Sequence, residues 1–143
     1  MSDLIGFTSI AFVSTLTLIA GLLRPNIFRI LFVALILRIV VMLIGHYLVE
    51  LPDSTADSRT FENYAWSLAQ IGFFNLMDNY TGPDPKFISW LIAIPYSLFG
   101  RSVLMAQSIS LIFGMSSVYL GWKIAKLIWN DQIANKVAWA IAL

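Results

Sequence analysis

The sequence predicts an all-α integral membrane protein, a helical bundle of about four or five transmembrane helices with one external loop. The composition supports this fold class, because 59% of the residues are hydrophobic, 12% are charged and the mean hydropathy is +0.80. These values lie outside the usual range of soluble domains. The apolar residues also gather in long runs, and a helix needs roughly 20 of them to cross a membrane.

The charges and the lack of cysteine exclude several classes of function. A formal net charge of +1, with nine scattered cations, gives no case for nucleic-acid binding. The chain has no cysteine, which excludes disulfides and thiolate metal sites. The apolar run 137–143 reaches the last residue without a polar tail. We therefore expect a module of a longer polytopic protein, whose missing C-terminal spans would be its partners together with the lipid bilayer.

The first two predicted spans are residues 4–23 and 27–49. A signal peptide is the rival interpretation of the first, but its start carries Asp3 in place of a cation and no A-x-A cleavage site follows. Pro25 disfavours helical geometry at Arg24, so the two spans should form a hairpin.

The second span contains two polar side chains, Arg38 and His46. Arg38 lies eleven residues into the span, close to mid-membrane. Lipid contact there would cost about 2.5–3.5 kcal/mol, so Arg38 should face protein or a wet cavity. Its partner could be structural, such as a carboxylate from a missing span, or functional. His46 lies on the same helix face and is predicted to be a polar filler, because the single histidine cannot build a metal site with a second one.

Residues 50–86 form a polar loop that holds six of the eight acidic residues. Within it, a helix of about residues 57–71 is predicted from apolar residues that recur at helical spacing on one face. These are Phe61, Tyr64, Ala65, Leu68, Ala69 and Gly72. Polar residues, Glu62 among them, take the other face. Because this amphipathic helix also contains Tyr64 and Trp66, we expect it to lie at the membrane surface and to end at Gly72.

The remaining apolar runs are residues 87–99, 102–122 and 133–143. The first is short for a span and contains Pro95, so it either crosses the membrane or is re-entrant. The second is a convincing span, and the third is the start of another.

Sidedness follows from the positive-inside rule. Arg24 and Arg29 put the first hairpin turn in the cytoplasm and the loop 50–86 on the non-cytoplasmic side of the plasma or inner membrane. If residues 87–99 cross the membrane, Lys123, Lys126 and Lys136 lie outside, against the rule. If these residues form a re-entrant helix, the three lysines lie inside. The family resemblance described below favours the crossing.

Three residues of the loop could carry chemistry. Asp53 and Asp57 can cap the loop helix, and they can also serve as carboxylates at the mouth of a membrane cavity. Lys86 can snorkel to the headgroups or bind a lipid phosphate. No metal site is predicted, although Asp53 and Asp57 are close enough in sequence to share a divalent cation with phosphate oxygens.

One run of residues resembles a known family. It reads Asp57-x3-Phe61-x3-Ala65-x2-Leu68-x3-Gly72, followed by Lys86, Trp90 and Pro95-Tyr96-Ser97-Leu98-Phe99-Gly100. The order and spacing resemble the amino-terminal part of the large polytopic C-type glycosyltransferases. These include the protein O-mannosyltransferases, the lipid A aminoarabinose transferases and enzymes of bacterial surface polysaccharide synthesis. The resemblance covers about residues 27–143.

The resemblance implies transfer of a sugar from a polyprenyl-phosphate donor to an acceptor on the outer face of the membrane. Asp57 matches the family's general base, with Asp53 as the alternative, and Lys86 matches the lysine that meets the lipid phosphate. Tyr80 and Glu62 are predicted as further substrate-binding residues. The chain departs from the family at Ser58, where an acid is usual, and after Lys86, where two prolines are common.

A non-catalytic interpretation remains open from the sequence alone. The chain could be a polytopic subunit, a scaffold or flippase-like protein that binds a lipid headgroup through Lys86. Asp53 and Asp57 separate the two, because a transferase needs one of these carboxylates whereas a scaffold would tolerate Asn at both.

Overall fold

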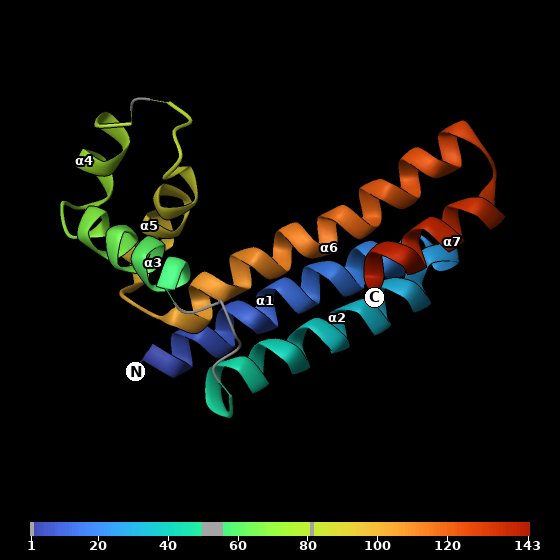
Figure 1. Ribbon diagram of the computed structural model, residues 1–143, viewed down its shortest axis with the longest axis horizontal. Helices are drawn as coiled ribbons and strands as arrows, with labels where there is room; N and C mark the ends of the chain where they lie inside the picture. Colours follow the sequence, from blue (N-terminus) through green and yellow to red (C-terminus); the bar gives the residue numbers. More distant parts are fainter. Residues whose placement is uncertain (1, 50–55, 81) are drawn as a thin grey trace.

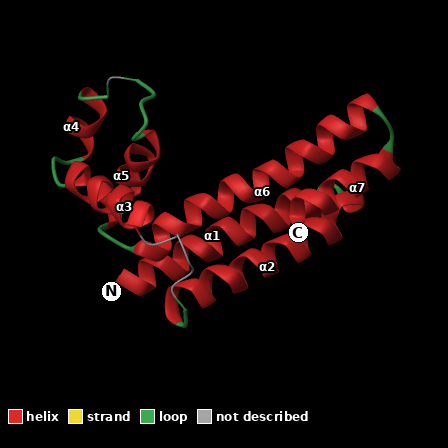
Figure 2. Cartoon of the chain, in the orientation of Figure 1, coloured by secondary structure: helices red, strands yellow, loops and turns green. Residues whose placement is uncertain are grey.

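The computed structural model describes residues 2–49, 56–80 and 82–143, and in this part of the chain it contains seven helices and no strand (Figure 2). The predicted all-helical fold class is therefore confirmed. In chain order the helices are α1 (Ser2–Leu22), α2 (Pro25–Tyr47), α3 (Ala56–Ala69), α4 (Phe73–Asp78), α5 (Phe87–Phe99), α6 (Val103–Ile128) and α7 (Asp131–Ala142).

The helices form a long bundle and a smaller cap. Helices α1, α2, α6 and α7 run side by side, and α3, α4 and α5 gather at one end of them (Figure 1). We call residues 56–99 the cap and the neighbouring end of the bundle the cap end. The start of α1, the end of α2 and the start of α6 lie at the cap end, whereas the α1–α2 and α6–α7 turns lie at the far end.

Among the described residues, three helices are long and apolar enough to cross a membrane: α1, α2 and α6, with 21, 23 and 26 residues. At about 1.5 Å per residue, each covers the roughly 30 Å of a hydrocarbon core. The 13-residue α5 packs on α3 and α4 in the cap, and α7 packs on α6 and α2. This packing gives no support to the predicted crossing at 87–99, and the fourth and fifth spans stay predictions.

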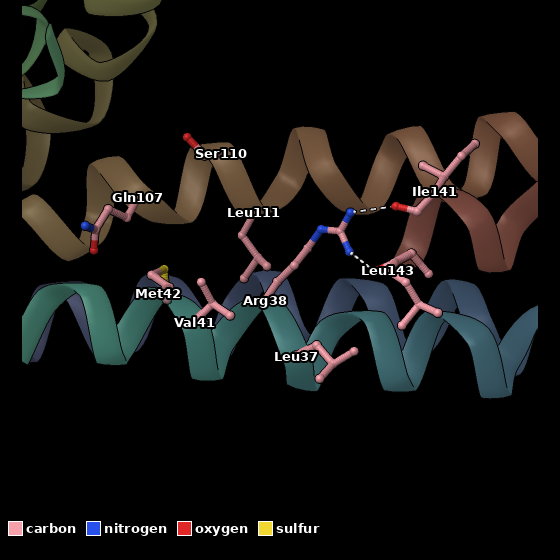
Figure 3. A pocket seen from close by; sticks show the side chains of 10 residues that line it. Leu37, Arg38, Val41, Met42, Gln107, Ser110, Leu111, Ile141 and Leu143 are labelled. Carbon is pink, nitrogen blue, oxygen red and sulfur yellow. Dashed lines mark hydrogen bonds between the residues drawn. The ribbon is translucent and has the colours of Figure 1, made fainter. Parts of the chain in front are cut away.

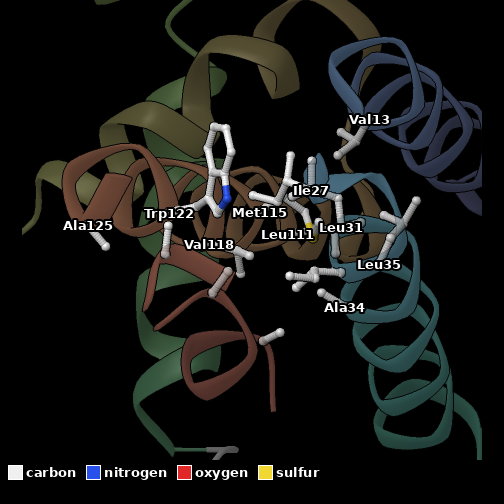
Figure 4. Close-up of a cluster of buried hydrophobic side chains, with 14 residues drawn as sticks. Val13, Ile27, Leu31, Ala34, Leu35, Leu111, Met115, Val118, Trp122 and Ala125 are labelled. Atoms are coloured by element: carbon white, nitrogen blue, oxygen red, sulfur yellow. The ribbon is translucent and has the colours of Figure 1, made fainter. Parts of the chain in front are cut away.

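The bundle core is built from apolar side chains of its four helices, and much of its outside is apolar as well. Ile27, Leu31, Leu111 and Val118 are among the buried members (Figure 4). On the outside, large side chains such as Phe12 are mostly exposed. An apolar exterior around an apolar core is what a bundle surrounded by lipid requires, and this supports a membrane protein.

Hydroxyl groups of α1 donate hydrogen bonds to carbonyl oxygens of the preceding helical turn. The five donors are Thr8, Ser9, Ser14, Thr15 and Thr17, at 2.7–3.0 Å. These bonds satisfy the hydroxyl donors within the helix itself, so that none of the five needs a water molecule as acceptor. The hydroxyl-rich composition of α1 is therefore compatible with a span.

Helix α6 runs six residues past the predicted end at Trp122 and so includes Lys123 and Lys126. Long lysine stems let the ammonium groups reach the interface without ending the helix. At the turn, Lys126 Nζ lies 2.7 Å from Asp131 Oδ1. Trp122 Nε1 donates to Asn135 Oδ1 at 3.0 Å, which ties α6 to α7.

The cap contains the predicted loop helix as α3, which ends near Gly72, a residue with a φ of 87°. Its buried face differs from the prediction. Ala65 and Ala69 are buried as expected, but Glu62, predicted on the polar face, is only 8% exposed. The buried face packs against α5, and the predicted position of α3 at the membrane surface stays a prediction. The short helix α4 was not predicted.

Candidate functional site

Asp57 and Lys86, the two residues to which the sequence gives the main roles, line one hollow of the cap. The hollow measures about 320 Å³ and lies between α3 and the turn that precedes α5. Both side chains are exposed. The other lining residues are Thr60, Phe61, Tyr64 and Pro85. A carboxylate from one helix and an ammonium from the next thus share one opening to the surroundings.

Local hydrogen bonds fix the position of Lys86. Its backbone N–H donates to Asp84 Oδ1 at 2.9 Å, and the N–H of Phe87 donates to the Asp84 carbonyl at 3.0 Å. This is the turn that an Asp side chain commonly stabilises two residues ahead of the donor. The Lys86 ammonium lies 4.2 Å from the centroid of the Tyr64 ring, within the range of a cation–π interaction.

A second, smaller hollow of about 80 Å³ adjoins the first, because Tyr64 and Lys86 line both. It brings in Tyr80, whose ring lies 4.2 Å from that of Trp90. The Trp90 Nε1 atom is buried and has no hydrogen-bond partner among the described residues. The structure therefore brings Asp57, Lys86 and Tyr80 into one connected region.

Glu62, also predicted to bind substrate, lies in a different place. Its Oε1 accepts from Arg101 Nε at 2.9 Å, and its Oε2 accepts from Arg101 Nη2 at 2.5 Å. The Tyr96 hydroxyl lies 2.8 Å from Glu62 Oε1 and 3.0 Å from the Ser102 carbonyl oxygen, two acceptors that share its proton. Glu62 thus joins α3, α5 and the start of α6. Sequence reasoning missed Arg101 and Tyr96 because they follow Glu62 by more than thirty residues.

This network changes the acidity of its members. Burial alone would raise the pKa of Glu62, but the hydrogen bonds from Arg101 and Tyr96 and the charge of Arg101 outweigh it and hold the pKa below its usual value. Burial and the neighbouring Glu62 carboxylate raise the pKa of Tyr96. The carboxylate is therefore ionised and the phenol protonated at neutral pH, which is the state that the hydrogen bonds require.

Asp53, the alternative general base, lies outside the described residues, and so does the predicted sharing of a cation between it and Asp57. Within the described ranges, no group of three or more His, Cys, Asp or Glu side chains lies together in a way that could hold a metal ion. The hollow itself offers a single described carboxylate, that of Asp57.

The two polar residues of α2 lie apart from the cap. Arg38 points toward α6 and α7, where its Nη1 donates to the Ala142 carbonyl at 2.9 Å and its Nη2 to the Ile141 carbonyl at 3.1 Å (Figure 3). His46 is half-buried near the cap end, and its ring meets that of Tyr47 edge-on at 4.6 Å.

No protein-family model, no curated protein and no solved structure matches the chain. The resemblance to C-type glycosyltransferases therefore stays a prediction. The case for a function rests on how the side chains of the cap lie.

Proposed function

We propose that the cap binds a polyprenyl-phosphate-linked sugar and that the chain is the amino-terminal module of a membrane glycosyltransferase. The observation that carries this proposal is the common hollow of Asp57 and Lys86. In this assignment Lys86 meets the donor phosphate and Asp57 faces the acceptor. The aromatic pair Tyr80–Trp90, beside Lys86, offers a surface for the sugar ring.

The chemistry needs both charged groups. Asp57 takes the proton of the acceptor hydroxyl while the hydroxyl oxygen forms a bond to the anomeric carbon of the sugar. The bond from that carbon to the phosphate oxygen breaks, and the phosphate leaves with the electron pair. The configuration at the anomeric carbon is inverted. The leaving group gains negative charge, which the Lys86 ammonium stabilises, so no protein acid is required at that position.

The charge distribution supports a cap on the non-cytoplasmic side. Five exposed cations lie toward the far end of the bundle: Arg24, Arg29, Lys123, Lys126 and Lys136. The cap and its connection to α6 carry only three exposed cations among the described residues, Arg59, Lys86 and Arg101, beside exposed acids such as Asp57, Asp78 and Asp84. Cytoplasmic ends carry an excess of Lys and Arg, so the far end is assigned to the cytoplasm. With α5 in the cap, the two hairpin turns obey the rule together, and the conflict that a crossing at 87–99 creates does not arise.

The sidedness can be tested directly because the chain has no cysteine. In intact cells, a membrane-impermeant maleimide is expected to label Asp78→Cys in the cap and to leave Gln132→Cys at the far end unlabelled. After permeabilisation both variants should react. If only Gln132→Cys were labelled in intact cells, the far end would lie outside the cell. The cap would then face the cytoplasm, which would contradict the proposed external site.

Donor binding is the first test of the function. In lipid nanodiscs, Lys86→Gln is expected to weaken the binding of a polyprenyl phosphate about tenfold, the equivalent of about 1.4 kcal/mol, through loss of the ion pair. Binding of the uncharged polyprenol should not change. Arg59→Gln is the matched control, because Arg59 is a cation of α3 that lines neither hollow. Equal binding of phosphate and alcohol by the unmodified protein would contradict the proposal.

A further inference from the structure

A groove of about 560 Å³ lies in the bundle, away from the cap, between α2, α6 and the last turn of α7. Figure 3 shows it from close by, with Gln107 toward one end and the Arg38 guanidinium toward the other. Most of the lining side chains are aliphatic, including Leu37, Val41 and Leu111. The groove therefore combines an apolar surface with one fixed positive charge.

Among the described residues, Arg38 donates hydrogen bonds to neutral groups alone. Its two hydrogen bonds go to the neutral carbonyls of Ile141 and Ala142, and no ion pair of Arg38 occurs among the described residues. The sequence contains no Asp or Glu in residues 4–49 or 87–128. Arg38 precedes Tyr47, the last residue of α2, by nine positions. At about 1.5 Å per residue this places it roughly 14 Å from the helix end, far from the headgroups.

Two further polar features lie along the same groove. The Gln107 Oε1 atom is buried and lacks a donor among the described residues. Ser110, one turn further along α6, is exposed on the groove. Gly114 makes room for the guanidinium, since a Cβ there would lie 2.8 Å from Arg38 Nε. The groove thus presents a cation and a hydroxyl on apolar walls, while the unmatched Gln107 oxygen lies buried behind the surface.

We propose that this groove binds a membrane-spanning helix that carries one carboxylate at mid-depth, opposite Arg38. Complementary charge is the reason for this occupant. An arginine without a charged partner is unfavourable at this depth, and a carboxylate would offset that cost. A lipid chain would fill the apolar walls but leave the charge unpaired, and a lipid headgroup would have to sink far below its usual layer. A second copy of the bundle brings no carboxylate at that depth.

The small, exposed Ser110 on α6 favours a helix over a bulkier partner, because small residues let two helices approach closely in a membrane. Gly114, four residues further along α6, is already covered by Arg38. The approaching helix would lay its carboxylate on the Arg38 guanidinium. This contact would give Arg38 a charged partner, which its two hydrogen bonds to neutral carbonyls do not supply.

A designed peptide tests the proposal without knowledge of the natural partner. The probe is a Leu/Ala helix of about 23 residues, long enough to cross the bilayer, with Glu or Gln at its centre. Energy transfer between labelled protein and labelled peptide in phosphatidylcholine vesicles is expected to report at least tenfold tighter binding of the Glu peptide. Arg38→Gln should remove the preference, and Arg38→Lys should retain part of it.

Two controls keep the result interpretable. Val41→Trp narrows the groove without changing its charge, so it should weaken the binding of both peptides alike. Unchanged binding of the Gln peptide by Arg38→Gln guards against a variant that simply misfolds. Equal binding of the Glu and Gln peptides by the unmodified protein would overturn the proposal. So would loss of Glu-peptide binding when phosphatidylglycerol replaces part of the phosphatidylcholine, because an anionic lipid would then be the occupant.

Discussion

Asp57→Asn is expected to lower sugar transfer about 100- to 10,000-fold, the usual contribution of a general base. Asparagine has nearly the same shape as aspartate but cannot take the proton of the acceptor hydroxyl. Donor binding should stay within about twofold of the original value, because the phosphate is assigned to Lys86 and not to Asp57. The measurement is transfer of a radiolabelled sugar from polyprenyl phosphate in membranes of cells that produce the longer protein to which this module would belong. Donor binding is measured beside it in nanodiscs.

Two companion variants make the outcome of the Asp57 experiment specific. Asp78→Asn removes another exposed acid of the cap that lines neither hollow, and it should transfer normally. Asp53→Asn tests the alternative base. If Asp53→Asn abolishes transfer while Asp57→Asn does not, the role belongs to Asp53. If all three variants behave like the unmodified protein while Lys86→Gln still loses donor binding, the chain is a lipid-binding subunit without a catalytic carboxylate.

Glu62→Ala is expected to destabilise the cap by about 1–3 kcal/mol. The substitution leaves the Tyr96 hydroxyl without its charged partner and removes both hydrogen bonds that Arg101 donates to the carboxylate. The expected value lies in the lower part of this range, because the Arg101 side chain is 42% exposed and water can solvate it. Unfolding of the cap can be followed by the fluorescence of Trp66 and Trp90.

The matched controls for this prediction are Arg101→Gln and the double variant. Because the two residues act through one ion pair, the double variant should cost less than the sum of the single ones. Additive effects would show that Glu62 and Arg101 stabilise the cap independently, contrary to the structure. Donor binding should weaken in each variant only as far as the cap unfolds, since Glu62 does not line either hollow.

The same network makes the stability of the cap depend on pH with a definite sign. The pKa of Glu62 is lower in the folded protein than its ordinary value of 4.5. Its stabilising contribution is therefore complete above pH 4.5 and is lost as the pH falls through the folded pKa. The unmodified cap should lose stability in that acidic window, and Glu62→Ala should lack this part of the loss.

Glu62 also has a consequence for the candidate site. It lies on α3 between Asp57 and Tyr64, while its partners Tyr96 and Arg101 lie on α5 and just after it. Ser89 adds a second tie, since its hydroxyl donates to the Phe61 carbonyl at 2.8 Å. These contacts hold α3 against α5 and so keep Asp57 and Lys86 at the same hollow. Glu62 thus positions α3 against α5, and its predicted substrate-binding role stays a prediction.

The sequence by itself determined the helical class, the long apolar helices α1, α2 and α6 and the existence of α3 with its end near Gly72. These features follow from local properties: long apolar runs, helical spacing of side chains and a glycine that ends a helix. Asp57, Lys86 and Tyr80 also stood out by type and position within the polar loop.

The tertiary structure alone decided how these pieces meet. In the folded chain α5 packs on α3, Glu62 is buried against Arg101 and Tyr96, and Arg38 points toward α6 and α7. None of these contacts has a local signal, because the partners are separated by 28 to 104 residues. Glu62 shows the physical reason most clearly: helical spacing assigned it to a polar face, but a distant arginine and tyrosine made its burial favourable.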